Sequence, residues 1–223
     1  MSALFITATG TDIGKTHLAC ALIRHLRARG REVEALKPVA TGFDPARPDQ
    51  SDTGLLLAAL GRPLTADNIA AATPWHFAAP LSPERAARRE GRELDFDQLV
   101  EYSRAAVRDH RGTLLIEGIG GVMVPLDPRH TVLDWIAALR IPALLVAGSY
   151  LGSISHALTC LEVMQRRDIA LRAVVINESP ASSVSIEDTA ESIALFTSGV
   201  PILRLMRANT PNDTIEHICK AMD

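Results

Sequence analysis

Short apolar runs alternate along the chain with longer amphipathic stretches. The runs have the length of strands buried on both faces, and they lie at 3–8, 33–39, 113–118, 142–148 and 172–177. The stretches show the apolar spacing of helices, and they lie at 15–29, 52–60, 95–110, 131–139, 152–167 and 185–197. A short strand at 200–205 and a helix from about 211 follow. The pattern predicts an α/β fold with a mostly parallel β-sheet and helices on both faces.

Residues 61–94 interrupt this alternation with several prolines, an alanine-rich part and the charged run ERAARREGRE. We interpret the segment as loops and short helices that leave the sheet at the carboxyl ends of its strands, where α/β folds gather their substrate sites. The group Trp75-His76-Phe77 inside it is typical of local packing. No linker or repeat is evident, so we expect one domain over residues 1–223.

Composition narrows the possible partners. The chain has 223 residues, of which 47% are hydrophobic, and a net charge of -3, so it has no global basic field and we expect no nucleic-acid partner. No apolar segment approaches the roughly 18 residues of a membrane span, so no membrane partner is expected. The cysteines Cys20, Cys160 and Cys219 lie far apart without CxxC spacing, which favours a reduced, cytoplasmic compartment.

Lysine is rare in this chain. It has twenty arginines but only three lysines, Lys15, Lys37 and Lys220. A lysine retained against this bias indicates a place where a compact ammonium is needed and a planar guanidinium would not fit, although chance is an open alternative. Two of the three lysines, Lys15 and Lys37, lie in candidate motifs.

The first motif is Gly14-Lys15-Thr16, which follows one predicted strand and opens a predicted helix. In that context backbone N–H groups and the helix N-terminus can surround phosphate oxygens, Lys15 can neutralise charge and the Thr16 hydroxyl can bind Mg²⁺. The usual phosphate loop has glycine five residues before Gly14, where this chain has Thr9. An ordinary strand-to-helix turn is therefore the alternative.

Three further charged residues are predicted at the same edge of the sheet. Glu117 ends an apolar strand and precedes GIGG, so its carboxylate is a candidate metal ligand. Asp52 opens a predicted helix, where it would be either a dipole partner or a third oxygen ligand for Mg²⁺. Lys37 precedes Pro38, which ends the strand, and its ammonium would enter the same crevice. The alternative for Lys37 is a solvated charge at a strand end. The seven histidines are scattered, and no zinc site is predicted.

Taken together, several blocks resemble the dethiobiotin synthetases, the ATP-dependent enzymes that close the ureido ring in biotin synthesis. The resemblance covers about residues 5–180. It is carried by FITATGTDIGKT, KPVATG, SDTGLL, TPWHFAAPLSP, IEGIGGVMVPL, DW, LGSISHAL and the strand end at Asn177. This family's loop has the form GTxxxxGKT, which accounts for the unusual spacing. Here its first glycine is replaced by Ala8, which matters little if Ala8 has a negative φ.

The resemblance implies a P-loop NTPase-like fold and a set of roles for the site residues. Lys15 and Lys37 would be catalytic, with Lys37 acting on the charge of the carbamate and the γ-phosphate. Asn177 would recognise the adenine edge. Mg²⁺ would be bound by Thr16, Asp52 and Glu117, and through the metal ion these residues would also help to bind ATP. The ATP phosphates would be held by Asp12, Ile13, Gly14, Lys15, Thr16 and His17. The substrate would be held by Thr11, Thr41, Gly118, Gly120 and Gly121.

The implied substrates are ATP, CO₂ and 7,8-diaminononanoate, and the implied assembly is a homodimer in which each subunit helps to complete the other's site. Ser155 stands where this family often has an asparagine that binds the substrate carboxylate, which implies a different contact at that end of the substrate. Beyond residue 180 the resemblance weakens, because ILRLMRANTP replaces the usual stretch.

Two other classes of protein remain as alternatives. A nucleotide switch of the partitioning or cell-division-site type carries a signature lysine in KGGxGKT, but this chain has Gly10 at that point. A related synthetase acting on a different amine shares the fold. Diamine-dependent turnover would distinguish these classes.

Overall fold

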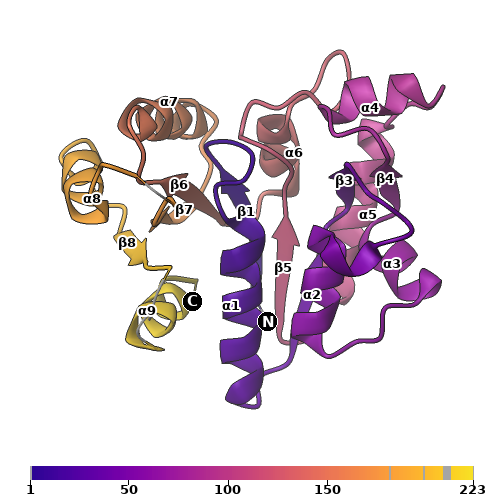
Figure 1. Ribbon diagram of the computed structural model, residues 1–223, viewed down its shortest axis with the longest axis horizontal. Helices are drawn as coiled ribbons and strands as arrows, with labels where there is room; N and C mark the ends of the chain where they lie inside the picture. Colours follow the sequence, from indigo (N-terminus) through magenta and orange to yellow (C-terminus); the bar gives the residue numbers. More distant parts are fainter. Residues whose placement is uncertain (1, 181, 198, 208–211, 223) are drawn as a thin grey trace.

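The computed structural model describes residues 2–180, 182–197, 199–207 and 212–222. Six parallel strands in this part of the chain form the central sheet (Figure 1), in the order β2-β5-β1-β6-β7-β8. Their bounds are Val33–Leu36 for β2, Thr113–Glu117 for β5, Ser2–Ala8 for β1, Ala143–Gly148 for β6, Leu171–Asn177 for β7 and Ile202–Leu205 for β8. All six strands end at the same edge, so the loops that follow them gather there.

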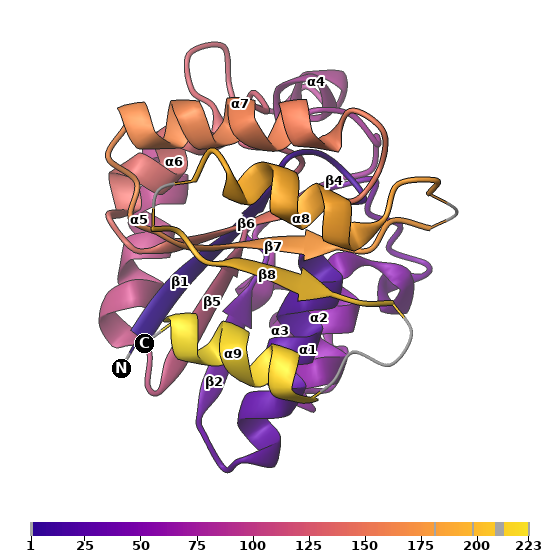
Figure 2. The ribbon, with the colours of Figure 1, turned by 90° about the vertical axis from the view of Figure 1, so that its left-hand side faces the viewer.

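Helices cover both faces of this sheet, as Figure 2 shows. One face carries α1 (Lys15–Ala28), α2 (Asp52–Leu60) and α9 (Asn212–Met222). The opposite face carries α5 (Phe96–Asp109), α6 (Val132–Leu139), α7 (Ser153–Arg166) and α8 (Ile186–Ala194). Alternate residues of β1 serve the two sides: Leu4 and Ile6 pack in one apolar cluster, and Phe5 in the other. The predicted parallel sheet with helices on both faces is confirmed, because continuous apolar strands can only be buried between two helical layers.

The predicted strand at 33–39 is wrong in one respect, because it is two strands. β2 ends at Leu36, and after Lys37-Pro38 the chain continues as β3 (Val39–Thr41) in a separate two-stranded sheet. Its partner is β4 (Trp75–Phe77), a strand where we expected loops and short helices. Three residues are too short for a readable alternation, so only the pairing across the fold reveals them.

The rest of the interrupting segment consists of loops and short helices, as expected: α3 spans Ala66–Ala72 and α4 spans Pro83–Arg89. Before this segment, a 3₁₀ turn, η1, spans Pro48–Gln50. The other predicted helices agree with the structure to within three residues at each end. The predicted start of the last helix, residue 211, lies outside the described residues. No helix in the described part of the chain has the length and apolar character that crossing a membrane requires.

Candidate functional site

The loop after β1 curls around its own lysine. The ammonium of Lys15 donates to the carbonyl of Gly120 at 2.9 Å and to that of Gly10 at 3.2 Å. Gly14 has φ 105°, and a Cβ there would lie 2.2 Å from Nδ2 of Asn177, so both backbone and space require glycine. Asn177 also donates from Nδ2 to the carbonyl of Ile13 at 2.9 Å. The end of β7 therefore supports the loop that opens α1.

Ala8, which stands in place of the family's first loop glycine, is the last residue of β1. It has the backbone of a strand, and its φ is not positive. Its methyl group is fully buried in the apolar cluster under α1. The loop thus has no need of glycine here, in line with the expectation for a negative φ.

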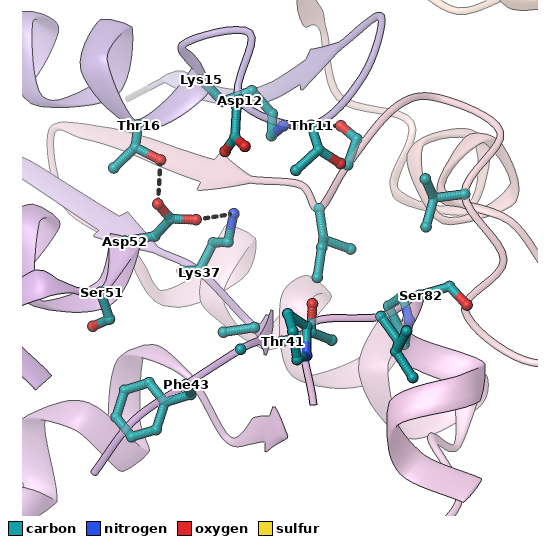
Figure 3. Close-up of a pocket in the computed structure, with 18 of the residues that line it drawn as sticks. Thr11, Asp12, Lys15, Thr16, Lys37, Thr41, Phe43, Ser51, Asp52 and Ser82 are labelled. Atoms are coloured by element: carbon teal, nitrogen blue, oxygen red, sulfur yellow. Dashed lines mark hydrogen bonds and ion pairs between the residues drawn. The ribbon is translucent and has the colours of Figure 1, made fainter. Parts of the chain in front are cut away.

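Lys37 lies between two carboxylates at the centre of the site. Its Nζ is 2.7 Å from Oε1 of Glu117 and 2.9 Å from Oδ2 of Asp52, and it donates to the carbonyl of Gly118 at 2.8 Å. Its side chain is 2% exposed and that of Glu117 is 1% exposed, whereas that of Asp52 is 45% exposed. Figure 3 shows Lys37 and Thr16 both directed toward Asp52. Pro38 ends β2 at this point, as the sequence predicts.

The hydroxyl of Thr16 lies near two carboxylate oxygens but can donate a hydrogen bond to only one of them. Its Oγ1 lies 2.8 Å from Oδ1 of Asp52 and 2.7 Å from Oε1 of Glu117, yet a hydroxyl has only one hydrogen to donate. In addition, Oε2 of Glu117 is buried without a hydrogen-bond partner among the described residues. Two carboxylates and a hydroxyl are hard oxygen ligands of the kind that Mg²⁺ prefers. These three residues therefore fit a divalent cation.

The charges of the site shift one another's pKa values. Burial works against the charge of Lys37, but Glu117 and Asp52 outweigh it and raise the pKa of Lys37. Burial likewise works against the charge of Asp52, but Lys37 outweighs it, and the pKa of Asp52 lies below its ordinary value. For Lys15, burial and then the charge of Lys37 lower the pKa to about 8. A bound anion would stabilise both ammonium groups.

A cavity of about 750 Å³ opens in front of these groups (Figure 3). One wall is polar and consists of the loop after β1, Lys37 and the start of α2. The other wall comes from β3, the turn before α4 and the loop after β5, and it is largely apolar. Its apolar lining residues are Ala40, Phe43, Pro80, Leu81, Pro83, Ile119 and Val124. The arrangement suits a ligand with a strongly anionic part and an aliphatic part.

Comparison with known proteins decides the family. The model of a family described as an AAA domain matches residues 2–215. An ATP-dependent dethiobiotin synthetase BioD of Acidiphilium cryptum is 50% identical over 202 residues, which cover 90% of this chain and 91% of the relative. The BioD of Methylobacterium nodulans is 51% identical over 212 residues, covering 93% and 94%. The chain belongs to the dethiobiotin synthetase family.

Solved structures show the same fold at low sequence identity. The cell division ATPase MinD of Pyrococcus furiosus aligns with a TM-score of 0.57 at 16% identity, over 97% of this chain and 88% of MinD. The chloroplast FtsY of Physcomitrella patens aligns with a TM-score of 0.53 at 14% identity, and the match covers 99% of this chain but 65% of FtsY. At such identities the likeness concerns the fold alone. It confirms the P-loop NTPase-like fold.

Most residues predicted for the site of this dethiobiotin synthetase family member lie together. The predicted residues that line the cavity are Thr11, Asp12, Gly14, Lys15, Thr16, Lys37, Thr41, Asp52 and Gly120. Glu117 and Gly118 do not line it, but both contact Lys37 from behind. Their proposed roles toward ATP, metal and substrate stay predictions.

Five further predicted residues are not part of the cavity lining. Ile13 and Gly121 belong to its supporting loops, and a Cβ on Gly121 would lie 3.0 Å from the carbonyl oxygen of Thr9. His17 is exposed on α1, and Asn177 lies behind the phosphate loop with its Oδ1 buried and unpaired among the described residues. Ser155 is exposed on α7 and is not brought to this cavity, so its assignment depends on a second subunit.

Sequence reasoning gave no role to the apolar wall or to Gln50, Ser51 and Ser82, which also line the cavity. The block TPWHFAAPLSP was part of the family resemblance, and its prolines could have indicated a fixed turn. The position of that turn, however, follows from the pairing of β3 with β4, which local sequence does not reveal.

Proposed function

We propose that this chain is an ATP-dependent dethiobiotin synthetase that acts on 7,8-diaminononanoate and CO₂. The observation that carries the proposal is the cavity, in which Lys15, Lys37 and Asp52 face a largely apolar wall, while Glu117 contacts Lys37 from outside the lining. The names of the 45–51% identical relatives support the same activity. The first wall suits phosphate and carbamate, and the second suits the carbon chain of the diamine.

In the proposed reaction, one amine of the diamine adds to CO₂ and loses a proton, which gives a carbamate. A carbamate oxygen then takes the γ-phosphoryl group of ATP, and ADP leaves. Finally the second amine attacks the carbamoyl carbon, phosphate departs with the original carbamate oxygen, and the ureido ring closes with release of a proton. None of these steps needs a covalent enzyme nucleophile, because positioning and charge stabilisation suffice.

Lys15 and Lys37 are the groups that stabilise the developing anions. Lys15 lies in the loop that would surround the phosphates, and Lys37 faces it across the cavity. Mg²⁺, when bound, would neutralise phosphate charge, and Thr16, Asp52 and Glu117 would hold it. The hydroxyl groups of Thr11 and Thr41 line the same cavity and can orient the amine and carbamate.

A homodimer is part of this proposal, as is a cytoplasmic location. The N-terminal turn of α7 follows the exposed Leu151, and both lie where a second subunit could contact the chain. Ser155, in this first turn of α7, would then face the carboxylate of the partner's substrate.

The test is phosphate release by the purified protein with MgATP and bicarbonate, with and without the diamine, followed by mass spectrometry of the product. We expect phosphate release to depend on the diamine and the ring-closed product to appear. Hydrolysis of ATP that is indifferent to the diamine, without product, would refute the proposal and favour a nucleotide switch or a synthetase for another amine.

A further inference from the structure

Lys37 has no N–H group left for a substrate in this arrangement. An ammonium has three hydrogens, and Lys37 faces three acceptors, one each on Glu117, Asp52 and Gly118, at 2.7 to 2.9 Å. The side chain is 2% exposed, so water cannot take the place of a lost partner. To bind a phosphate or carbamate oxygen, Lys37 must release at least one of these acceptors.

The two carboxylates that Lys37 holds are the same two that, with Thr16, fit a divalent cation. Lys37 contacts Oε1 of Glu117, and the hydroxyl of Thr16 contacts that same atom. A metal ion bound to this set would therefore lie within a few ångströms of the ammonium. Two cations on one acidic pair repel each other strongly where little water screens them. The ammonium and the metal ion thus compete.

The sum of charges points the same way. Lys15 and Lys37 balance Asp52 and Glu117, so the four side chains carry no net charge. A divalent cation alone would give this buried group an excess of two positive charges, whereas a polyphosphate arriving with it would remove that excess. A polyphosphate also supplies new acceptors for the ammonium.

We propose that Lys37 is the internal counter-ion of Asp52 and Glu117, which keeps divalent cations out until a nucleotide arrives, so that metal and nucleotide enter the site together. The nucleotide part rests on the proposed function. The two ion pairs at 2.7 and 2.9 Å support the proposal, because in them the ammonium already neutralises both carboxylates. The shortage of hydrogens around Thr16 is removed once a metal ion joins the three oxygens.

Lys15 provides a matched control within the same site. It is also a buried lysine, but its ammonium contacts the neutral carbonyl groups of Gly10 and Gly120. It influences Asp52 and Glu117 only through longer-range electrostatic interaction. If contact with the carboxylates is what excludes the metal, neutralising Lys37 should matter far more than neutralising Lys15.

The experiment measures Mn²⁺ binding to nucleotide-free protein by electron paramagnetic resonance of the unbound ion. We expect Lys37→Met to bind Mn²⁺ at least about tenfold more tightly than the wild type, and Lys15→Met to stay within about threefold of it. Equal affinities of the wild type and Lys37→Met would overturn the proposal. Circular dichroism checks the fold, and Lys37→Gln is the second variant if Lys37→Met is unfolded.

A second titration adds the β,γ-imido analogue of ATP, which is not hydrolysed. We expect the analogue to strengthen Mn²⁺ binding to the wild type by about a hundredfold, and to strengthen it much less in Lys37→Met, because there the metal site is already open. A wild-type affinity that the analogue leaves unchanged would also overturn the proposal. This arm needs no variant, so it can overturn the proposal even if substitution of Lys37 prevents folding. Because the analogue itself binds Mn²⁺ through its phosphates, support for the proposal comes from the difference between the wild type and Lys37→Met.

These readouts are independent of turnover. If Lys37 excludes Mn²⁺ but no diamine-dependent product forms, the proposed reaction is refuted and the proposed exclusion of metal ions by Lys37 is still supported. If diamine-dependent product forms but the nucleotide-free wild type binds Mn²⁺ as tightly as Lys37→Met, the reaction is supported and the proposed exclusion of metal ions by Lys37 is refuted.

Discussion

At the scale of single residues, the main feature of the site is the contact of one buried lysine with two carboxylates. Lys37 lies between the carboxylates of Asp52 and Glu117, and each of the three N–H groups of its ammonium has an acceptor in this arrangement. Arginine, which dominates the basic residues of this chain, could not replace it, because a planar guanidinium cannot direct donors to three acceptors around one atom. The structure thus gives a reason for the lysine that the sequence singled out.

Lys37→Gln should keep nucleotide binding and lose most turnover. The change removes the charge that we assign to the transferring phosphoryl group, and such groups contribute about a hundredfold or more to kcat. Steady-state kinetics with the diamine, beside calorimetric titration of the ATP analogue, measure the two effects separately. Lys15→Gln is the comparison, and there the loss should extend to nucleotide binding. An unchanged kcat in Lys37→Gln would remove this residue from the mechanism.

Two of the buried thiols should be unreactive in the folded protein. Burial raises the pKa of Cys20 and of Cys160 to about 11. Because the thiolate is the nucleophile, only about 0.1% of either side chain is reactive at pH 8, and burial hinders access further. Alkylation with iodoacetamide, read by peptide mass spectrometry, should label both slowly in the native protein and fully in urea. Rapid labelling of the native protein would contradict the burial seen here.

At the scale of elements, the phosphate loop depends on a strand that lies far from it in sequence. Asn177 ends β7, yet it contacts Ile13 and leaves no room for a side chain on Gly14. A motif that looks local in the sequence is therefore completed by a contact across 164 positions. Oδ1 of Asn177 is buried and has no hydrogen-bond partner among the described residues, so the predicted contact with adenine requires this side chain to be uncovered.

Gly14→Ala should nearly abolish nucleotide binding, because it adds a clash with Asn177 to a positive φ of 105°. Combining it with Asn177→Ala should restore only part of the affinity, since the backbone strain of roughly 1–2 kcal/mol remains. Calorimetric titration of the ATP analogue against both variants and Asn177→Ala alone separates the two effects. Full recovery in the double variant would mean that the clash is the sole cause. Normal binding by Gly14→Ala would show that this loop conformation is not the binding one.

At the scale of the whole molecule, Trp135 links the helical layer to the sheet. It is fully buried, its ring meets that of Phe5 edge-on at 4.8 Å, and its indole N–H donates to the hydroxyl of Ser103 at 3.1 Å. The sequence marked this residue only as part of the family resemblance. The structure shows that α5, α6 and β1 meet around it.

Trp135→Ala should therefore destabilise the protein by about 3–5 kcal/mol, the usual cost of removing a large buried aromatic ring. Trp135→Phe is the control: it keeps much of the packing and loses the indole hydrogen bond, so it should cost clearly less. Urea unfolding followed by circular dichroism measures both. A loss of less than about 1 kcal/mol for Trp135→Ala would contradict a well-packed centre at this position.

The sequence by itself determined the layered α/β fold and the proximity of Lys37, Asp52 and Glu117 to the loop after β1. It could do so because buried strands are apolar throughout, and because the carboxyl ends of parallel strands meet at one edge, so residues after different strands come together. The prediction of one domain over residues 1–223 rests on the absence of an evident linker or repeat and stays a prediction.

Only the tertiary structure decided which residues form the apolar wall of that site and how the charge of Lys37 is paired with the two carboxylates. The pairing of β3 with β4, which forms the apolar wall, involves strands of three residues, too short for any periodic signal. The position of Lys37 between its two carboxylates depends on distances of 2.7 to 2.9 Å across 15 and 80 positions of sequence. Such contacts are set by the packing of whole elements, and no local pattern of hydrophobic and polar residues encodes them.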